Sequence, residues 1–153
     1  GLISPLFFFL AGSVIYERTQ TRMMDEMGGL FTSAPLIGAL TAFTAFANLG
    51  LPGLAGFPGE FFTFAGAFPV FTFGVVIAAL GLVLTAGYHL RMMQRVVMGE
   101  PLALAERKDL VGRELLVAVP LMVLILVLGI MPGVALGVFN EPIAVMAAKL
   151  GGL

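Results

Sequence analysis

The chain has 153 residues, of which 59% are hydrophobic and only 11% charged, with a formal net charge of −1 and a mean hydropathy of +1.07. Soluble domains carry about 25% charged residues, and a soluble fold of this size could not hide so much apolar surface. The near-neutral charge and the lack of a basic arm or patch give no indication of a nucleic-acid partner, and the absence of cysteine excludes disulfides and thiolate metal sites. We therefore predict an integral membrane protein.

Four apolar stretches predict an all-α, polytopic transmembrane bundle of about four helices, one of them discontinuous. We expect helices over about residues 2–17, 35–68, 70–97 and 113–139, all within one membrane domain over residues 1–153. The first stretch is shorter than the roughly 20 residues that span a bilayer, and the chain starts at Gly1 without an initiator methionine. We therefore expect the C-terminal part of a longer protein.

The positive charges predict the topology. Loops 17–34 and 91–114 hold two and five of the eight basic residues. If residues 35–68 cross the membrane once, both loops lie on the same side, and the positive-inside rule makes that side the cytoplasm. A re-entrant stretch 35–68 would separate the loops. We favour the single crossing and expect a bacterial inner (plasma) membrane.

The second stretch is too long for a simple span, because its 34 residues would form a helix of about 50 Å. A hydrocarbon core is about 30 Å thick. Glycine and proline predict a break near residues 50–59, where the helix-breaking residues are Pro52, Gly53, Gly56, Pro58 and Gly59. Irregular backbone at membrane depth survives only when buried in protein or lining a wet cavity, and broken helices are typical of ion-coupled transporters.

Glu60 follows the break and is the only charged residue between Glu26 and Arg91. An ionised carboxylate in hydrocarbon costs several kcal/mol. The group can therefore take up a proton or face a cation or water, and either state suits a proton relay. The alternative is that Glu60 caps the helix that follows the break. We favour the relay.

Other polar residues could line a path to Glu60. Thr41, Thr44 and Asn48 share one helical face, which could line a hydrated channel. They could equally bond to a neighbouring helix or to their own carbonyls, which we favour for the threonines and leave open for Asn48. His89, the only histidine, could shuttle protons, but we favour a role as an interfacial anchor.

A family resemblance rests on the break itself. Residues 48–61, NLGLPGLAGFPGEF, resemble the broken-helix signature of the antiporter-like subunits of respiratory complex I, most closely the M type (chain 4 in mitochondrial naming) of proton-pumping NADH:quinone oxidoreductase. The L and N types and many subunits of sodium/proton antiporters usually have lysine where Glu60 stands. Three further patches agree: YERT at 16–19 with Thr21-Arg22, Arg91-Met92 with Gln94-Arg95-Val96, and Asp109-Leu110 with Arg113-Glu114.

The resemblance implies that Glu60 is the terminal carboxylate of a chain of buried ionisable groups and exchanges protons with the periplasmic side. It implies other membrane-arm subunits, lipid and protons as partners, and no nucleic acid. NADH, flavin, iron–sulfur clusters and quinone are expected in other subunits, so we expect no cofactor, metal or redox active site in this chain. Two alternatives stay open: a subunit of a multi-component cation/proton antiporter, and a non-transporting membrane scaffold.

Overall fold

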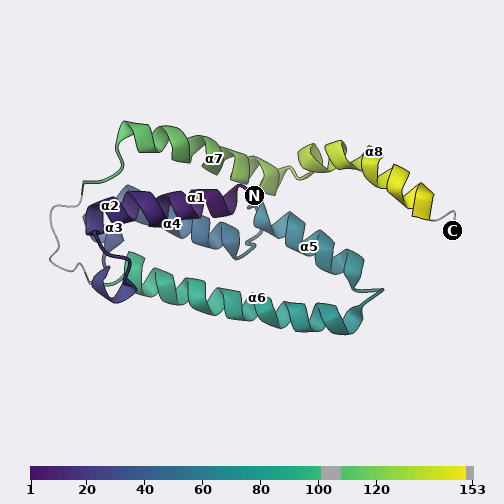
Figure 1. Cartoon of the computed structure of the whole chain (residues 1–153), viewed down its shortest axis with the longest axis horizontal. Helices are drawn as coiled ribbons and strands as arrows, with labels where there is room; N and C mark the ends of the chain where they lie inside the picture. The colour runs from purple at the N-terminus through teal and green to yellow at the C-terminus, as the bar shows by residue number, and fades with distance from the viewer. Residues whose placement is uncertain (101–107, 151–153) are drawn as a thin grey trace.

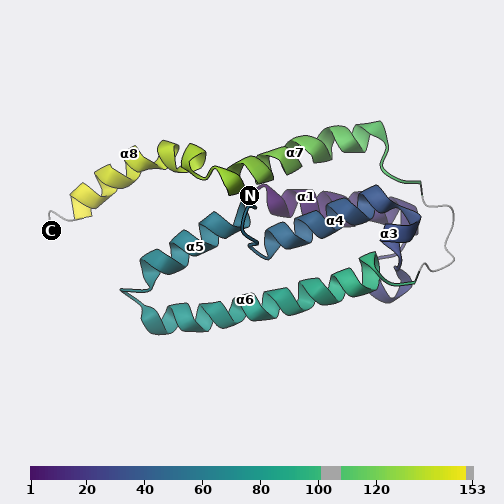
Figure 2. The same ribbon diagram turned by 180° about the vertical axis from the view of Figure 1, so that it is seen from behind.

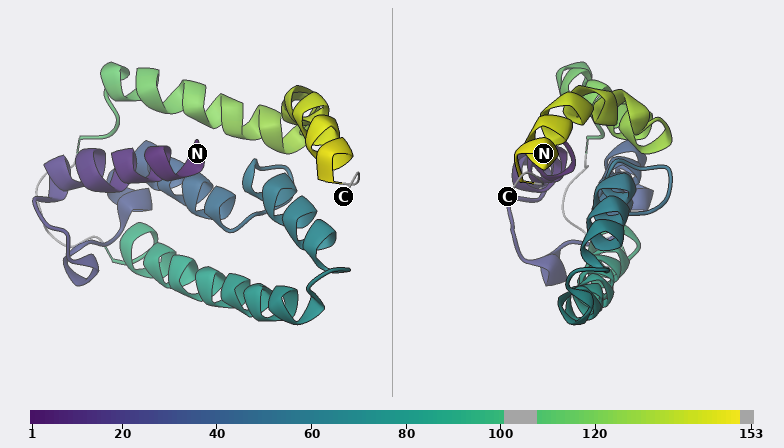
Figure 3. Two further views of the ribbon diagram at one scale, coloured as in Figure 1. Left: turned by 45° about the vertical axis from the view of Figure 1, so that its right-hand side comes forward. Right: turned by 90° about the vertical axis from the view of Figure 1, so that its right-hand side faces the viewer.

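The computed structural model describes residues 1–100 and 108–150, and within these ranges the chain is helical with no strand (Figure 1). The all-α prediction is confirmed for these residues. Helices α1, α4, α6 and α7 lie roughly along one common direction, while α8 extends beyond them (Figures 1 and 3). The described residues of loops 17–34 and 91–114 lie at one end of this arrangement, which we call the loop end.

The first helix is continuous but changes its winding. It comprises α1 (Ile3–Phe9), a π-helical segment η1 (Leu10–Ile15) and α2 (Tyr16–Thr19), and it ends at Gln20 in a left-handed conformation. We call residues 3–19 helix 1. The short helices η2 (Met24–Glu26) and α3 (Leu30–Ser33) follow at the loop end. Helix 1 lies beside α4 and runs in the opposite direction (Figure 2).

The second apolar stretch forms two helices, α4 (Pro35–Asn48) and α5 (Gly56–Ala67), joined by non-helical residues 49–55. The predicted non-helical segment, 50–59, extends too far. Residues 56–59 are helical, and Pro58 is compatible with the helix because it occupies the third position of α5. There its missing N–H has no partner within the helix anyway, so proline is tolerated. Pro35, at the first position of α4, is accommodated for the same reason.

Two of the described helices are long and apolar enough to cross a membrane. One is α6 (Thr72–Met92), which continues into the π-helical η3 (Met93–Val97); the other is α7 (Gly112–Ile130). Most of their side chains are exposed, and in α6 proper only His89 is buried. Apolar helices with so little cover are suited to lipid or to further protein surfaces.

The fourth predicted helix, 113–139, is wrong at its end. Helix α7 stops at Ile130, and a separate helix α8 (Gly133–Leu150) follows. Pro132 lacks an N–H and disfavours helical backbone at the residue before it, and Met131 accordingly has φ −123 and ψ 64. Residues 140–150 therefore belong to an 18-residue helix that is separate from α7.

The core lies where helix 1, α4 and α7 meet. Its most buried side chains include Leu6, Leu10, Ile37 and Ile125, none of them measurably exposed. Helix α4 is the best-covered helix, with more than half of its residues buried, whereas α5 has none. The two helices that flank residues 49–55 therefore differ sharply in how firmly they are packed.

The two charged loops meet at the loop end. Arg95 pairs with Asp25, and Gly28 lies against the backbone of Glu100. Arg107, which the topology argument counts, lies outside the described residues. The described residues of the two charged loops therefore lie next to each other, at the end of the bundle away from α5 (Figure 1).

Candidate functional site

Residues 49–55, which we call the break, consist of two recognised turn motifs. Helix α4 ends in a Schellman motif: Gly50 N–H donates to Ala47 O at 3.3 Å, and Leu51 N–H donates to Phe46 O at 3.3 Å. Gly50 has φ +66, as this motif requires. The helix end is thus determined by a glycine that can adopt a left-handed backbone.

A second turn follows immediately. Leu54 N–H donates to Leu51 O at 3.1 Å, with Pro52 and Gly53 as the central residues. Gly53 has φ +91, which makes this a type II turn with proline and glycine at their preferred positions. The two motifs satisfy several backbone groups that a simple interruption would leave unpaired, and this matters in a membrane.

The break is covered on one side by α7. An added Cβ at Gly129 would overlap the carbonyl of Gly53 and the backbone of Leu54. Leu54 and Ala55 also pack against the core cluster that includes Ile125. The break therefore packs against α7 through Gly53, Leu54 and Ala55, whereas Leu51 and Pro52 are exposed.

Glu60 lies in the second turn of α5, and its carboxylate lies over Gly50. An added Cβ at Gly50 would overlap the carboxylate oxygens, so the missing side chain of Gly50 leaves the room that Glu60 occupies. Glu60 is half-buried and has no hydrogen bond or ion pair within residues 1–100 and 108–150. It makes no capping bond to the start of α5.

The threonines of α4 bond to their own helix. The hydroxyl of Thr41 donates to Ile37 O at 2.7 Å, and that of Thr44 lies 2.9 Å from both Leu40 O and Thr41 O. Both side chains are buried. Their geometry matches the backbone-bonding alternative, which stabilises the threonine side chains without any channel.

Asn48 and His89 share a cavity of about 260 Å³ between helix 1, the end of α4 and α6, with Ser4 and Thr85 among its lining residues. The Nδ1 atom of His89 lies 3.0 Å from Thr85 O. Because a carbonyl only accepts, Nδ1 is the donor in this hydrogen bond. The structure thus brings together two polar residues separated by 41 positions.

A cluster at the loop end was missed by the sequence reasoning. The Arg18 guanidinium forms a bidentate pair with Glu114, with N–O distances of 2.9 and 2.7 Å. It also donates to backbone carbonyls of Val14, Lys108 and Asp109. All five of its N–H donors are therefore used, and helix 1 is joined to the start of α7.

Asp109 completes this cluster by capping α4 from another part of the chain. Its two carboxylate oxygens accept the N–H groups of Leu36 at 3.0 Å and Ile37 at 3.1 Å. These belong to the first turn of α4, whose N–H groups lack partners within the helix. The sequence offered one signal for part of this cluster, the start of α7. Glu114 lies three residues after Val111, as in a capping box, and its carboxylate accepts the N–H of Val111 at 2.9 Å.

The described residues contain no group of three or more side chains suited to hold a metal ion. The arrangement around Glu60 can hold or release a proton, or bind a cation. It contains no nucleophile paired with a base in the described part of the chain.

Comparisons with known proteins identify a family for this chain. Residues 1–85 match the family described as NADH:quinone oxidoreductase/Mrp antiporter, TM. The chain is 37% identical over 146 residues to NADH-quinone oxidoreductase subunit M of Rhodobacter capsulatus, covering 94% of this chain and 28% of that protein. It is 41% identical over 132 residues to the subunit M of Pseudomonas aeruginosa, covering 86% of this chain and 26% of that protein.

A solved structure is also similar. A chain of respiratory complex I from Thermus thermophilus with bound NADH matches with a TM-score of 0.77 and 38% identity, over 82% of this chain and 26% of that chain. The present chain thus spans between a quarter and a third of the length of these relatives.

Proposed function

This chain belongs to the NADH:quinone oxidoreductase/Mrp antiporter transmembrane family, and from that membership we propose that it forms part of a proton-translocating subunit in the membrane arm of NADH:quinone oxidoreductase. Glu60 carries the proton. Redox cofactors and the quinone belong to other subunits, which drive this one. The names of the similar proteins, subunit M in both bacteria, support this assignment over other members of the family.

One observation carries the mechanism: the Glu60 carboxylate faces a backbone break and has no bonding partner in the described residues. A carboxylate with such sparse protein contacts at membrane depth changes charge readily when a neighbour or water changes. The adjoining cavity of Asn48 and His89 supplies polar groups at the break side of α4. We assign these two residues to the path that leads protons to Glu60.

The proposed topology has four crossings: helix 1, the pair α4–α5, α6 and α7. Helix α5 continues away from the loop end in the same direction as α4 (Figure 1), which supports a single crossing with a break inside it. Together α4 and α5 contain 26 helical residues, about 39 Å of helix, enough for a hydrocarbon core of about 30 Å. The loop end then faces the cytoplasm.

The test is Glu60→Gln in the full-length parent protein, with the intact complex reconstituted in proteoliposomes. NADH oxidation and proton uptake are followed together. We expect proton uptake to fall about tenfold or more in fully assembled complex, because the amide cannot titrate. Glu100→Gln, an exposed carboxylate at the loop end, is the matched control and should leave both rates unchanged. If both rates are unchanged in Glu60→Gln, Glu60 has only a structural role, and the alternative of a non-transporting scaffold is supported.

A second candidate, a subunit of a multi-component cation/proton antiporter, is favoured by the family description, which names Mrp antiporters. The same vesicles separate the two. Proton uptake that requires NADH and quinone supports the oxidoreductase, whereas uptake driven by an imposed sodium gradient, without NADH, supports the antiporter.

A further inference from the structure

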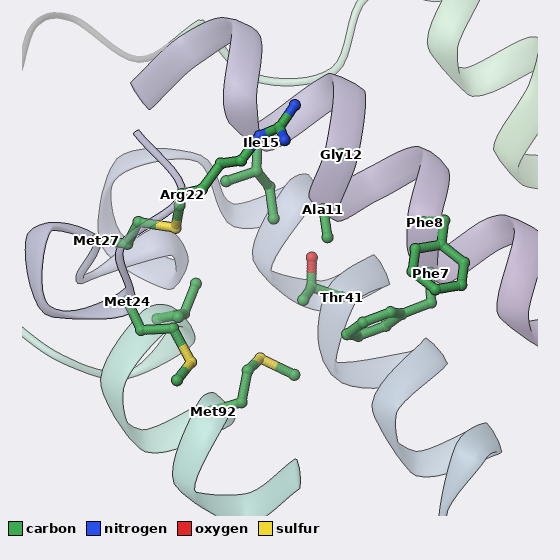
Figure 4. Close-up of a pocket in the computed structure, with 11 residues that line it drawn as sticks. Phe7, Phe8, Ala11, Gly12, Ile15, Arg22, Met24, Met27, Thr41 and Met92 are labelled. Atoms are coloured by element: carbon green, nitrogen blue, oxygen red, sulfur yellow. The ribbon is translucent and has the colours of Figure 1, made fainter. Parts of the chain in front are cut away.

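A groove of about 430 Å³ lies between helix 1, α4 and the end of α6, close to the loop end (Figure 4). Phe7 and Phe8 line one end of it, and Met24, Met27 and Met92 line much of the rest. These walls are mostly apolar, and methionine side chains adapt readily to a flexible apolar occupant. The groove does not include the break, and it shares only Phe7 and Phe8 with the cavity of Asn48 and His89.

The groove exists because helix 1 presents small side chains to it. Ala11 and Gly12 lie within the π-helical segment η1, and an added Cβ at Gly12 would meet nothing within 4 Å. The buried hydroxyl of Thr41 faces the same space but donates to Ile37 O at 2.7 Å. Apolar contact therefore governs what binds along the walls.

One charge lines the groove, and it lies at the end opposite Phe7 and Phe8 (Figure 4): the guanidinium of Arg22. Arg22 lies over the ring of Tyr16 at 4.9 Å and has no carboxylate partner in the part of the chain that the structure describes. The nearby acids are engaged elsewhere, since Asp25 pairs with Arg95 and Glu26 accepts the hydroxyl of Thr21. Neither acid is among the residues that line the groove, so the charge in its lining is positive.

A long apolar wall with one positive charge at its end is complementary to an amphipathic anion. Phe7 and Ile15 are eight residues apart on helix 1, so the apolar wall extends about 12 Å from the charged end towards the middle of the bundle. An acyl chain fits such a wall, and a phosphate fits the planar fork of an arginine. Basic pockets between transmembrane helices on the cytoplasmic side bind anionic headgroups in general.

We propose that the groove binds one anionic phospholipid, with its phosphate on Arg22 and an acyl chain between helix 1 and α4. The lipid fills the space that Ala11 and Gly12 leave open and secures the loop after helix 1 against α6. It is selected over a neutral or zwitterionic lipid by the charge of Arg22.

The experiment uses the intact complex that contains the full-length parent, in membranes carrying a photoactivatable phosphatidylglycerol with a diazirine in its acyl chain. A phosphatidylcholine with the same acyl chain is the comparison probe. Labelled peptides are mapped by mass spectrometry. We expect phosphatidylglycerol to label residues around Met24, Met27 and Met92, about fivefold more than phosphatidylcholine does, the factor expected for one basic residue near an anionic lipid.

Two variants with matched controls test the two halves of the proposal. Arg22→Gln should lower the phosphatidylglycerol labelling about fivefold, to the phosphatidylcholine level, while Arg91→Gln, an exposed arginine outside the groove, should not. Gly12→Leu should fill the groove and abolish labelling by both lipids, while Gly81→Leu, where an added Cβ also meets open space, should not.

Three results would overturn the proposal. Equal labelling by the two lipids would show that Arg22 selects nothing. Labelling that is unchanged in Gly12→Leu would place the lipid outside the groove. If neither lipid labels these residues in the wild-type complex, a protein segment covers the groove instead.

Discussion

At the loop end, the charged side chains that join helices bond to other groups of the protein. At the break, the carboxylate of Glu60 has no hydrogen bond or ion pair within the described residues. Arg18 uses all five donors, Glu114 accepts from Arg18 and Val111, and Asp109 accepts from the start of α4. Glu60, by contrast, only lies over the backbone of Gly50. Charges whose bonds are complete hold structure, and a charge without partners is available for chemistry. Variants in the Arg18 cluster should therefore impair assembly, and variants at the break should impair transport.

The largest expected effect comes from Arg18→Ala in the full-length parent. Arg18 and Glu114 are only 12% and 14% exposed, so removal of one partner leaves a largely desolvated charge and costs about 3–5 kcal/mol. We expect little assembled complex on a native gel, with a normal ratio of protons to NADH in whatever assembles.

The double variant Arg18→Ala, Glu114→Ala is the control for this pair. Because the two groups interact directly, its loss of stability should be clearly smaller than the sum of the single losses. Additive losses would mean that the pair does not act as a unit, and a changed proton ratio would break the contrast between the two regions.

An intermediate effect is expected from Gly50→Ala. The left-handed backbone at φ +66 costs about 1–2 kcal/mol for alanine, and the new Cβ overlaps the carboxylate of Glu60. Proton uptake should fall severalfold in assembled complex although the carboxylate itself is intact, as measured in proteoliposomes.

Gly59→Ala sharpens this test, because residue 59 adjoins Glu60 in the helix and its added Cβ meets open space. It should leave proton uptake unchanged and stabilise α5 slightly, since alanine is the better helix former. Equal losses in both variants would point to general disturbance of α5, and not to the position of the carboxylate.

The smallest expected effect is that of Arg95→Ala. Its partner Asp25 is 79% exposed, and exposed ion pairs contribute about 0–1 kcal/mol. Thermal inactivation of the complex should shift by no more than about 2 °C for a large assembly. A large shift would show that this pair, and not only the cluster of Arg18, holds the two charged loops together.

Local chemistry made much of the fold predictable from the sequence. Apolar length indicated the spans that became α6 and α7, and the segment from Gly50 to Gly53 predicted an interrupted helix because left-handed backbone and proline stop α4 within a few residues. The same local rules, applied more carefully, would have placed the start of α5 at Gly56 and the end of α7 before Pro132.

The candidate site was predictable only in part. Glu60 is conspicuous in sequence, because it is a single charge in a long apolar stretch. That its carboxylate lies over Gly50, that Gly129 packs on the break, and that Asn48 shares a cavity with His89 depend on which helices are neighbours. One sequence without its partners carries no such information.

What the sequence by itself determined is where helices begin, break and end, since these depend on backbone preferences within a few residues and on the length of apolar runs. What only the tertiary structure decided is which charges meet. Arg18 and Glu114 are 96 positions apart, and Asp109 caps a helix that starts 74 positions earlier. Such pairings depend on helix packing, and they distinguish Asp109 and Glu114, which join helices, from Glu60, which has no bonding partner in the described residues.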